Sequence, residues 1–264
     1  MVSGRRRWAL LAAAVFYCVA AAPPPQKVIA RIDLSKPFRL PPGATFTATQ
    51  GPDVEDPAYG APDTAPGRIR LCVRMAHAKD CAPDLDSSLS WENDPDWSEI
   101  HYLQIARIVQ ARGSTSPPLL YIEIGSFHGL NGNQLRAAVF LAYRPASHRF
   151  EVIIHEKFGL NNNEEVRFIE AGPLKGNVVT AEPTSNAPFG YWMSVSRLTP
   201  DYRYRQVLKY RSATRYNDGN PLAVIDSEMP NILQRLGYWR PGQSLPLPAG
   251  KCARPRLVKG ALWC

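Results

Sequence analysis

The chain has 264 residues and a formal net charge of +8, because 31 lysine and arginine residues outweigh 23 acidic residues. A chain of this length forms one large domain or two small ones and buries a core without crosslinks, which excludes a miniprotein whose fold depends on disulfides. The basic balance favours acidic partners such as envelope phosphates or anionic polysaccharides, although secreted proteins without an anionic ligand often share it.

The first 21 residues are predicted to form a signal peptide. Three arginines at 5–7 precede an uncharged run of apolar and small residues at 8–22, which three prolines at 23–25 bring to an end. Cleavage after Ala21 fits the preference for small residues and leaves a net charge of +5, since the signal contains three arginines and no acidic residue. The alternative is an uncleaved anchor, but the run is shorter than the roughly 20 residues that a spanning helix needs. We therefore expect a periplasmic or secreted protein with no transmembrane segment after signal removal.

Proline and the apolar pattern divide the rest of the chain into three parts. Residues 22–66 are predicted to be a proline-rich N-terminal segment with early strands at 27–34 and 44–49. A mainly β domain is expected over 67–240, followed by a proline-rich tail at 241–264 that a disulfide closes.

Four cysteines remain after signal removal. Four cysteines allow three pairings, and the short separations favour Cys72 with Cys81 and Cys252 with Cys264, each pair closing a local loop. A metal site is disfavoured because the chain has no CxxC motif and no histidine pair at ligand spacing near these cysteines. Disulfides agree with an exported protein.

The β domain is predicted from short segments that alternate between apolar and polar residues. The first lies at 68–75, and the β-branched residues of 101–111 favour a strand there over a helix. Further strands, separated by turn residues, are expected at 119–127, 136–144, 149–157, 165–170, 177–182, 191–199 and 202–211. This spacing predicts a mainly β fold, an antiparallel meander that forms a sandwich, a barrel or a partial propeller.

One short C-terminal helix is predicted. Asp226 or Ser227 is expected to cap it, Pro230 fits its first turn, and Gly237 ends it. The apolar stripe that is expected to cover a sheet edge or a barrel end consists of Ile232, Leu233 and Leu236.

Familiar catalytic signatures are incomplete in this chain. Ser126 follows a strand within a glycine-flanked turn, but Ile124 stands where a nucleophile elbow requires glycine. His155 and Glu156 begin a zinc-protease motif whose second histidine is replaced by Gly159. We therefore expect no cofactor and favour a protein that is not an enzyme.

If the protein is an enzyme, paired carboxylates are its candidate catalytic groups. Glycoside hydrolysis needs two carboxyl groups roughly 5–10 Å apart. Glu123, Glu165 and Glu182 lie on or beside different strands, where they could converge, although charged residues on strands are usually solvated. The aromatic residues that could stack on sugar rings are Trp91, Trp97 and Trp192.

Two oxygen-rich loops are weak candidates for calcium binding. One contains Asn163 and Glu164, and the other contains Asn217 and Asp218. Calcium takes six to eight oxygen ligands of these kinds. Ordinary turns explain the same residues, because asparagine and aspartate bond to their own backbone and tolerate left-handed conformations. We therefore predict no metal site.

A basic strand is the strongest candidate for a binding surface. Strict alternation over 202–211 places Arg203, Arg205, Lys209 and Arg211 on one face of that strand. A row of cations can bind phosphates or carboxylates. Interleaved aromatic residues also suit nucleic acids, but the predicted export argues against nucleic acid as the native partner.

These observations lead to an exported, non-catalytic binding or structural module, and the ligand we expect for it is an anionic envelope polymer. One alternative is an envelope saccharide hydrolase that uses the paired carboxylates. A second alternative is a secreted protein inhibitor that presents the loop between Cys72 and Cys81, with Met75, His77 and Lys79.

Overall fold

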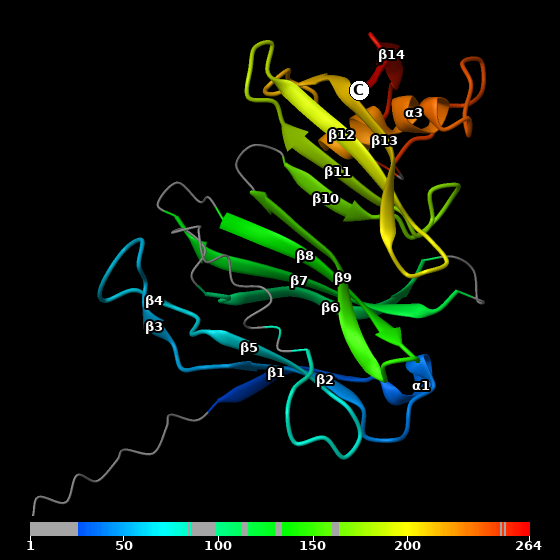
Figure 1. The fold of residues 1–264 in the computed structure, drawn as a ribbon. Helices are drawn as coiled ribbons and strands as arrows, with labels where there is room; N and C mark the ends of the chain where they lie inside the picture. The colour runs from blue at the N-terminus through cyan, green and yellow to red at the C-terminus, as the bar shows by residue number, and fades with distance from the viewer. Residues whose placement is uncertain are drawn as a thin grey trace, which may run out of the picture.

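The protein is described by a computed structural model, shown in Figure 1. The predicted signal peptide and the candidate residues Trp91, Trp97 and Asn163 lie outside the described residues. The residues described are 26–83, 85, 99–111, 116–129, 134–159, 164–248, 250 and 252–264.

Three antiparallel sheets follow one another along the chain and stack as layers (Figure 1). This arrangement confirms the mainly β fold and the antiparallel pairing, and the sheets remain open rather than closing into a barrel. The N-terminal sheet has the order β1-β2-β5, and a short helix, α1, joins β1 to β2. These elements are β1 (Lys27–Asp33), α1 (Ser35–Phe38), β2 (Thr45–Gln50) and β5 (Ile69–Arg74).

The central and third sheets are four-stranded meanders in which each strand pairs with its neighbour in sequence. The central sheet consists of β6 (Tyr102–Gln110), β7 (Pro118–His128), β8 (Gln134–Arg144) and β9 (Arg149–Gly159). The third sheet consists of β10 (Glu165–Phe168), β11 (Val178–Pro183), β12 (Gly190–Leu198) and β13 (Tyr204–Arg215).

Two small ribbons and one longer helix complete the fold. The loop after β2 contains β3 (Val54–Glu55) and β4 (Thr64–Ala65), and the tail contains β14 (Arg256–Val258) and β15 (Ala261–Trp263). Helix α3 (Val224–Arg235) covers the face of the third sheet that points away from the central sheet (Figure 1).

The central sheet is buried on both faces. Leu120 and Ile122 pack against the N-terminal sheet, while Tyr121 and Phe140 pack against Phe168 of the third sheet. The Tyr121 and Phe140 rings stack with their centroids 4.5 Å apart. Because both faces are covered, β7 and β8 are almost continuously apolar over most of their length rather than alternating.

Helix α3 begins earlier than the sequence indicated. Ala223 is its N-cap residue and offers no side-chain cap, so Asp226 lies in the first turn and Pro230 lies inside the helix. The Glu165 carboxylate, 59 residues away in sequence, accepts a hydrogen bond of 2.6 Å from the Val224 N–H. A partner from another element therefore replaces the local cap that was predicted.

A buried carboxylate fixes the same helix to β13. Glu228 is fully buried and accepts hydrogen bonds from the Tyr210 hydroxyl at 2.9 Å and from the Thr214 hydroxyl at 2.7 Å. The Thr214 N–H and the Asn231 side chain also donate to it, at 2.8 and 2.9 Å. These four donors compensate for removing the Glu228 carboxyl group from water.

Both predicted cysteine pairs are bonded. The Cα atoms of Cys72 and Cys81 lie 5.1 Å apart, and those of Cys252 and Cys264 lie 5.4 Å apart. Two disulfides of this kind are typical of proteins in oxidising compartments outside the cytoplasm. Within the residues that the structure describes, no helix has both the length and the apolar character needed to cross a membrane.

We expect Phe140→Ala to lower the free energy of unfolding by about 3–5 kcal/mol, because it leaves a cavity between the central and third sheets. Urea denaturation followed by circular dichroism measures this loss. Val28→Ala is the control, because Val28 is 58% exposed and its truncation should change stability by less than about 0.5 kcal/mol. Equal effects of the two variants would contradict the layered core.

Candidate binding surface

A β-bulge in β13 divides the cations that strict alternation placed together. Leu208 pairs with Val195 and Gln206 pairs with Ser196, so Val207 is an extra residue without a partner in the ladder. An extra residue reverses the face on which the following side chains lie. Arg205 therefore shares a face with Tyr210, on the side of α3, whereas Lys209 and Arg211 lie on the opposite face.

The bulge brings Arg205 into register with a cation that the sequence analysis did not single out. Arg205 lies directly opposite Arg197 of β12. Arg203, in the turn just before β13, is also exposed, and the exposed fractions of the Arg203 and Arg205 side chains are 73% and 70%. We call Arg197, Arg203 and Arg205 the hairpin-end arginines.

One carboxylate, Asp201, lies close to two of these arginines. Its Oδ2 atom is 3.9 Å from Arg203 Nε and 3.8 Å from a terminal nitrogen of Arg205. The Thr199 hydroxyl donates to Asp201 and, together with the two arginines, holds the pKa of this carboxyl below its usual value. Two arginines beside one ionised aspartate, with Arg197 opposite Arg205 on the neighbouring strand, leave the hairpin end with a positive charge.

The other two predicted cations have structural neighbours. The Lys209 ammonium lies 5.8 Å from the centre of the Trp192 ring, and this tryptophan is 40% exposed. Arg211 donates to the carbonyl oxygens of Pro188, at 2.6 Å, and Asn186, at 3.2 Å. These two bonds assign the Arg211 guanidinium to holding the loop between β11 and β12.

Arg144 makes the polar attachment of the hairpin end to the central sheet, beside the packing of Tyr204 against Phe140. Arg144 of β8 donates to the carbonyl oxygen of Asp201 at 2.7 Å, and its guanidinium lies 5.2 Å from the centre of the Tyr202 ring. Glu151 accepts a hydrogen bond of 2.9 Å from the same guanidinium. This attachment fixes the turn that carries Arg203.

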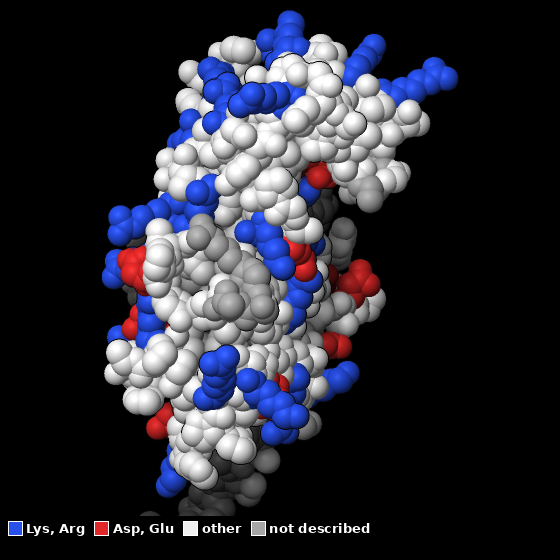
Figure 2. All heavy atoms as spheres, turned by 90° about the vertical axis from the view of Figure 1, so that its right-hand side faces the viewer, with Lys and Arg blue, Asp and Glu red and all other residues white. Residues whose placement is uncertain are grey.

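The face of the molecule that lies on the right-hand side in Figure 1 is shown in Figure 2. Lysine and arginine side chains are visible over its whole height and predominate over the acidic side chains. The turn between β12 and β13 lies on this side of the molecule (Figure 1).

The three predicted carboxylates do not form one catalytic group. Glu123 is buried in the central sheet, where it accepts from the Tyr121 hydroxyl at 3.0 Å and pairs with Arg136 at 3.2 Å. Glu165 lies on the α3 side of the third sheet and is bonded to the start of that helix. Glu182 is exposed at the end of β11.

Glu182 instead approaches two glutamates that the sequence analysis did not propose as catalytic. Burial raises the pKa values of Glu156 and Glu164, and the charge of Glu182 raises both further. Glu156 also shares a row of the central sheet with Glu123, because Ala138 pairs with both. Two strand spacings place the Glu123 and Glu156 backbones about 10 Å apart.

The candidate calcium residues that the structure describes bond to nearby backbone. Asp218 accepts hydrogen bonds from the N–H groups of Arg215, at 3.1 Å, and Asn220, at 3.0 Å, while Asn217 adopts the left-handed conformation. Glu164 accepts from the Gly159 N–H at 2.6 Å. No group of three or more histidine, cysteine or acidic side chains suited to a metal ion occurs in the described part of the chain.

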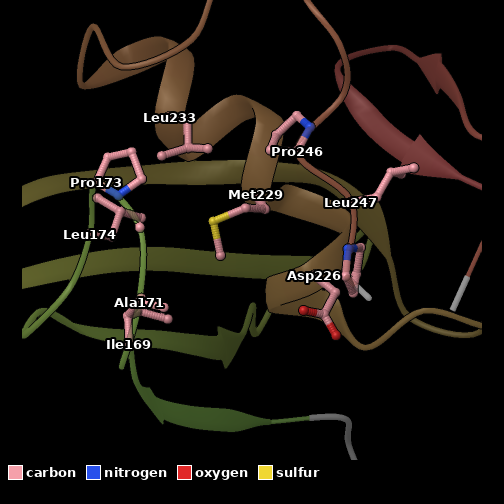
Figure 3. Close-up of a pocket in the computed structure, with 11 residues that line it drawn as sticks. Ile169, Ala171, Pro173, Leu174, Asp226, Met229, Leu233, Pro246 and Leu247 are labelled. Atoms are coloured by element: carbon pink, nitrogen blue, oxygen red, sulfur yellow. The ribbon is translucent and has the colours of Figure 1, made fainter. Parts of the chain in front are cut away.

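An apolar hollow of about 320 Å³ lies against α3 (Figure 3). Met229 projects into it from the helix, with Pro173 and Leu174 on one side and Leu247 on another (Figure 3). Asp226 is the charged member of its lining, and Arg167 pairs with that carboxylate. The hollow therefore has no charge complementary to an anionic polymer.

The loop proposed to present an inhibitory segment lies at the end of the N-terminal sheet. Met75 packs partly against the core, whereas His77 and Lys79 are exposed. The Ala82 N–H returns to the Val73 carbonyl oxygen at 2.8 Å and, with the disulfide, closes the loop.

No protein-family model, curated protein or solved structure matches this chain.

Glu156→Gln should raise the melting temperature at pH 7 by about 1–3 °C. The raised pKa means that the stabilising contribution of Glu156 is fully present below the usual pKa of 4.5 and is lost as the pH rises through the folded-state value. The gain from glutamine should therefore vanish near pH 4. Glu170→Gln is the control, because this exposed glutamate pairs with Arg107 and its loss should not raise the melting temperature. A lower melting temperature of Glu156→Gln at pH 7 would contradict the conclusion that burial and Glu182 disfavour the charged form of Glu156.

Proposed function

We propose that this protein is an exported, non-catalytic module that binds an anionic polymer of the cell envelope at the hairpin end. The observation that carries the proposal is the direct opposition of Arg197 and Arg205 on β12 and β13. Like charges placed directly opposite each other destabilise a sheet. A bound polyanion would neutralise this repulsion; among the described residues, Asp201 lies beside Arg205, and Arg197 donates to the uncharged Tyr238 hydroxyl at 3.2 Å.

The side-chain chemistry supports a carboxylate or phosphate polymer. A guanidinium presents planar donors that match both groups, and it stays charged over the physiological pH range. The hairpin-end arginines lie on neighbouring strands and the adjoining turn, so successive charged groups of one polymer strand can reach more than one of them. The two disulfides support an exported protein.

Reversing the charge of Arg203 and Arg205 tests the proposal. The double variant Arg203→Glu/Arg205→Glu should lose at least about tenfold in affinity for isolated envelope material, because two attractive contacts become repulsive. Co-sedimentation of the protein that begins at Ala22, at about 20 mM and about 500 mM salt, measures this loss. Wild-type binding should also fall at the higher salt concentration.

A matched control reverses the charge of two arginines on the N-terminal sheet. Arg31 and Arg70 are exposed on the N-terminal sheet, so Arg31→Glu/Arg70→Glu changes the net charge equally without altering the hairpin end. This control should bind about as well as wild type, apart from a uniform loss from its lower net charge. Unaltered binding by the Arg203/Arg205 variant, or equal loss by both variants, would refute the hairpin end as the site.

A second candidate function is envelope saccharide hydrolysis. It is supported because burial and the charge of Glu182 raise the pKa of Glu156, and an exposed aromatic residue lies beside Glu182. Trp192 lies directly opposite Glu182 on β12. Under this alternative, release of reducing sugars from envelope polysaccharide should fall at least about 100-fold in both Glu156→Gln and Glu182→Gln. Glu99→Gln, distant in sequence and paired with Arg68, serves as the control. No sugar release by the wild-type protein would eliminate the alternative.

A further inference from the structure

A polar and aromatic pocket of about 540 Å³ adjoins the turn that carries Arg203. Four parts of the fold meet there: the end of α1, the end of β6 with the start of β7 and the two residues before it, the hairpin of β8 and β9, and the turn between β12 and β13. The lining residues are Pro37, Phe38, Arg39, Gln110, Ser116, Pro117, Pro118, Tyr143, Pro145 and Tyr202.

Two of the lining residues adopt a left-handed backbone conformation that residues other than glycine rarely take. Arg39 has φ of 57° and Tyr202 has φ of 58°. A left-handed conformation is less favourable for such residues than for glycine. The Arg144 guanidinium packs over the Tyr202 ring, and this contact explains why a tyrosine rather than a glycine occupies the position.

Arg39 has no comparable structural role. It is exposed, and no hydrogen bond or ion pair joins its guanidinium to another residue of the described part of the chain. Glycine would satisfy the backbone better at this position, where Arg39 ends α1. An unpartnered guanidinium at a position that favours glycine, beside a pocket, indicates that its side chain is kept for an external anion.

The other lining groups match a sugar ring. Tyr143 and Tyr202 supply aromatic surface, and Phe38 is buried beneath the pocket with its ring 4.9 Å from that of Phe150. Gln110 and Ser116 supply hydrogen-bonding groups for hydroxyls. Specific small-ligand sites combine apolar and aromatic walls with a few polar groups in this way.

The geometry points to this pocket as the site for one sugar ring of an acidic polysaccharide, with Arg39 bound to the carboxylate of that ring. The inference rests on the proposed function and narrows it: the hairpin-end arginines take any polyanion, and the pocket selects a saccharide. Polygalacturonate and inorganic polyphosphate separate the two roles, because both are polyanions and only the first has sugar rings.

Arg39→Gly is the decisive variant, because it removes the guanidinium and places glycine at a left-handed position that glycine adopts without strain. Its melting temperature should equal or exceed that of wild type. Its affinity for polygalacturonate, measured by titration calorimetry, should fall at least about tenfold, while its affinity for polyphosphate should change by no more than about twofold. Tyr143→Leu, which removes an aromatic ring of the pocket, should show the same selective loss.

Lys259→Gly is the matched control. Lys259 is an exposed cation with φ of 50° in the turn between β14 and β15, so the change also removes one positive charge at a left-handed position, in a different part of the fold. This control should bind both polymers as wild type does. If Arg39→Gly binds polygalacturonate normally, or loses both polymers equally, the pocket is not a sugar site although the proposed function stands. If wild type binds neither polymer, the proposed function itself fails.

Discussion

The central sheet is buried on both faces, and this burial positions the two outer sheets. The stacked rings of Tyr121 and Phe140 and the apolar side chains on the other face fix an outer sheet to each side. Arg144, at the end of β8, then holds the turn between β12 and β13 through the carbonyl oxygen of Asp201. The position of the hairpin-end arginines therefore follows from the packing of the central sheet. A binding surface built on these strands and tight turns is better fixed in shape than one on a long loop.

Local patterns predicted the strands well because each strand is a local feature. The alternation over 68–75 and the turn residues between later segments located β5 to β13 to within a few residues. The small ribbons β3, β4, β14 and β15 were missed because strands of two or three residues are too short to show a period. The start of α3 was also missed, because its N–H partner, Glu165, comes from a strand that no local cap rule considers.

The candidate site depended on a feature that alternation hides. Strict alternation placed Arg203, Arg205, Lys209 and Arg211 on one face, and the extra residue Val207 separates them. A bulge has no reliable signal in a single sequence, so the pairing of Arg205 with Arg197 followed only from the register. Arg39 carried no signal either, since its importance rests on a left-handed backbone and on segments far apart in sequence that meet at the pocket.

Backbone amide chemical shifts, recorded while the isotopically labelled protein is titrated with polygalacturonate, show where on the fold an acidic polysaccharide binds. If the polymer binds at the hairpin end and the pocket, the shifts change at residues 197–205 and around Arg39, and these changes vanish at high salt. Residues around Arg31 and Arg70 of the N-terminal sheet should stay unchanged. Changes confined to the N-terminal sheet, or changes around Glu156 and Glu182 without any at the hairpin end, would contradict binding at the hairpin end.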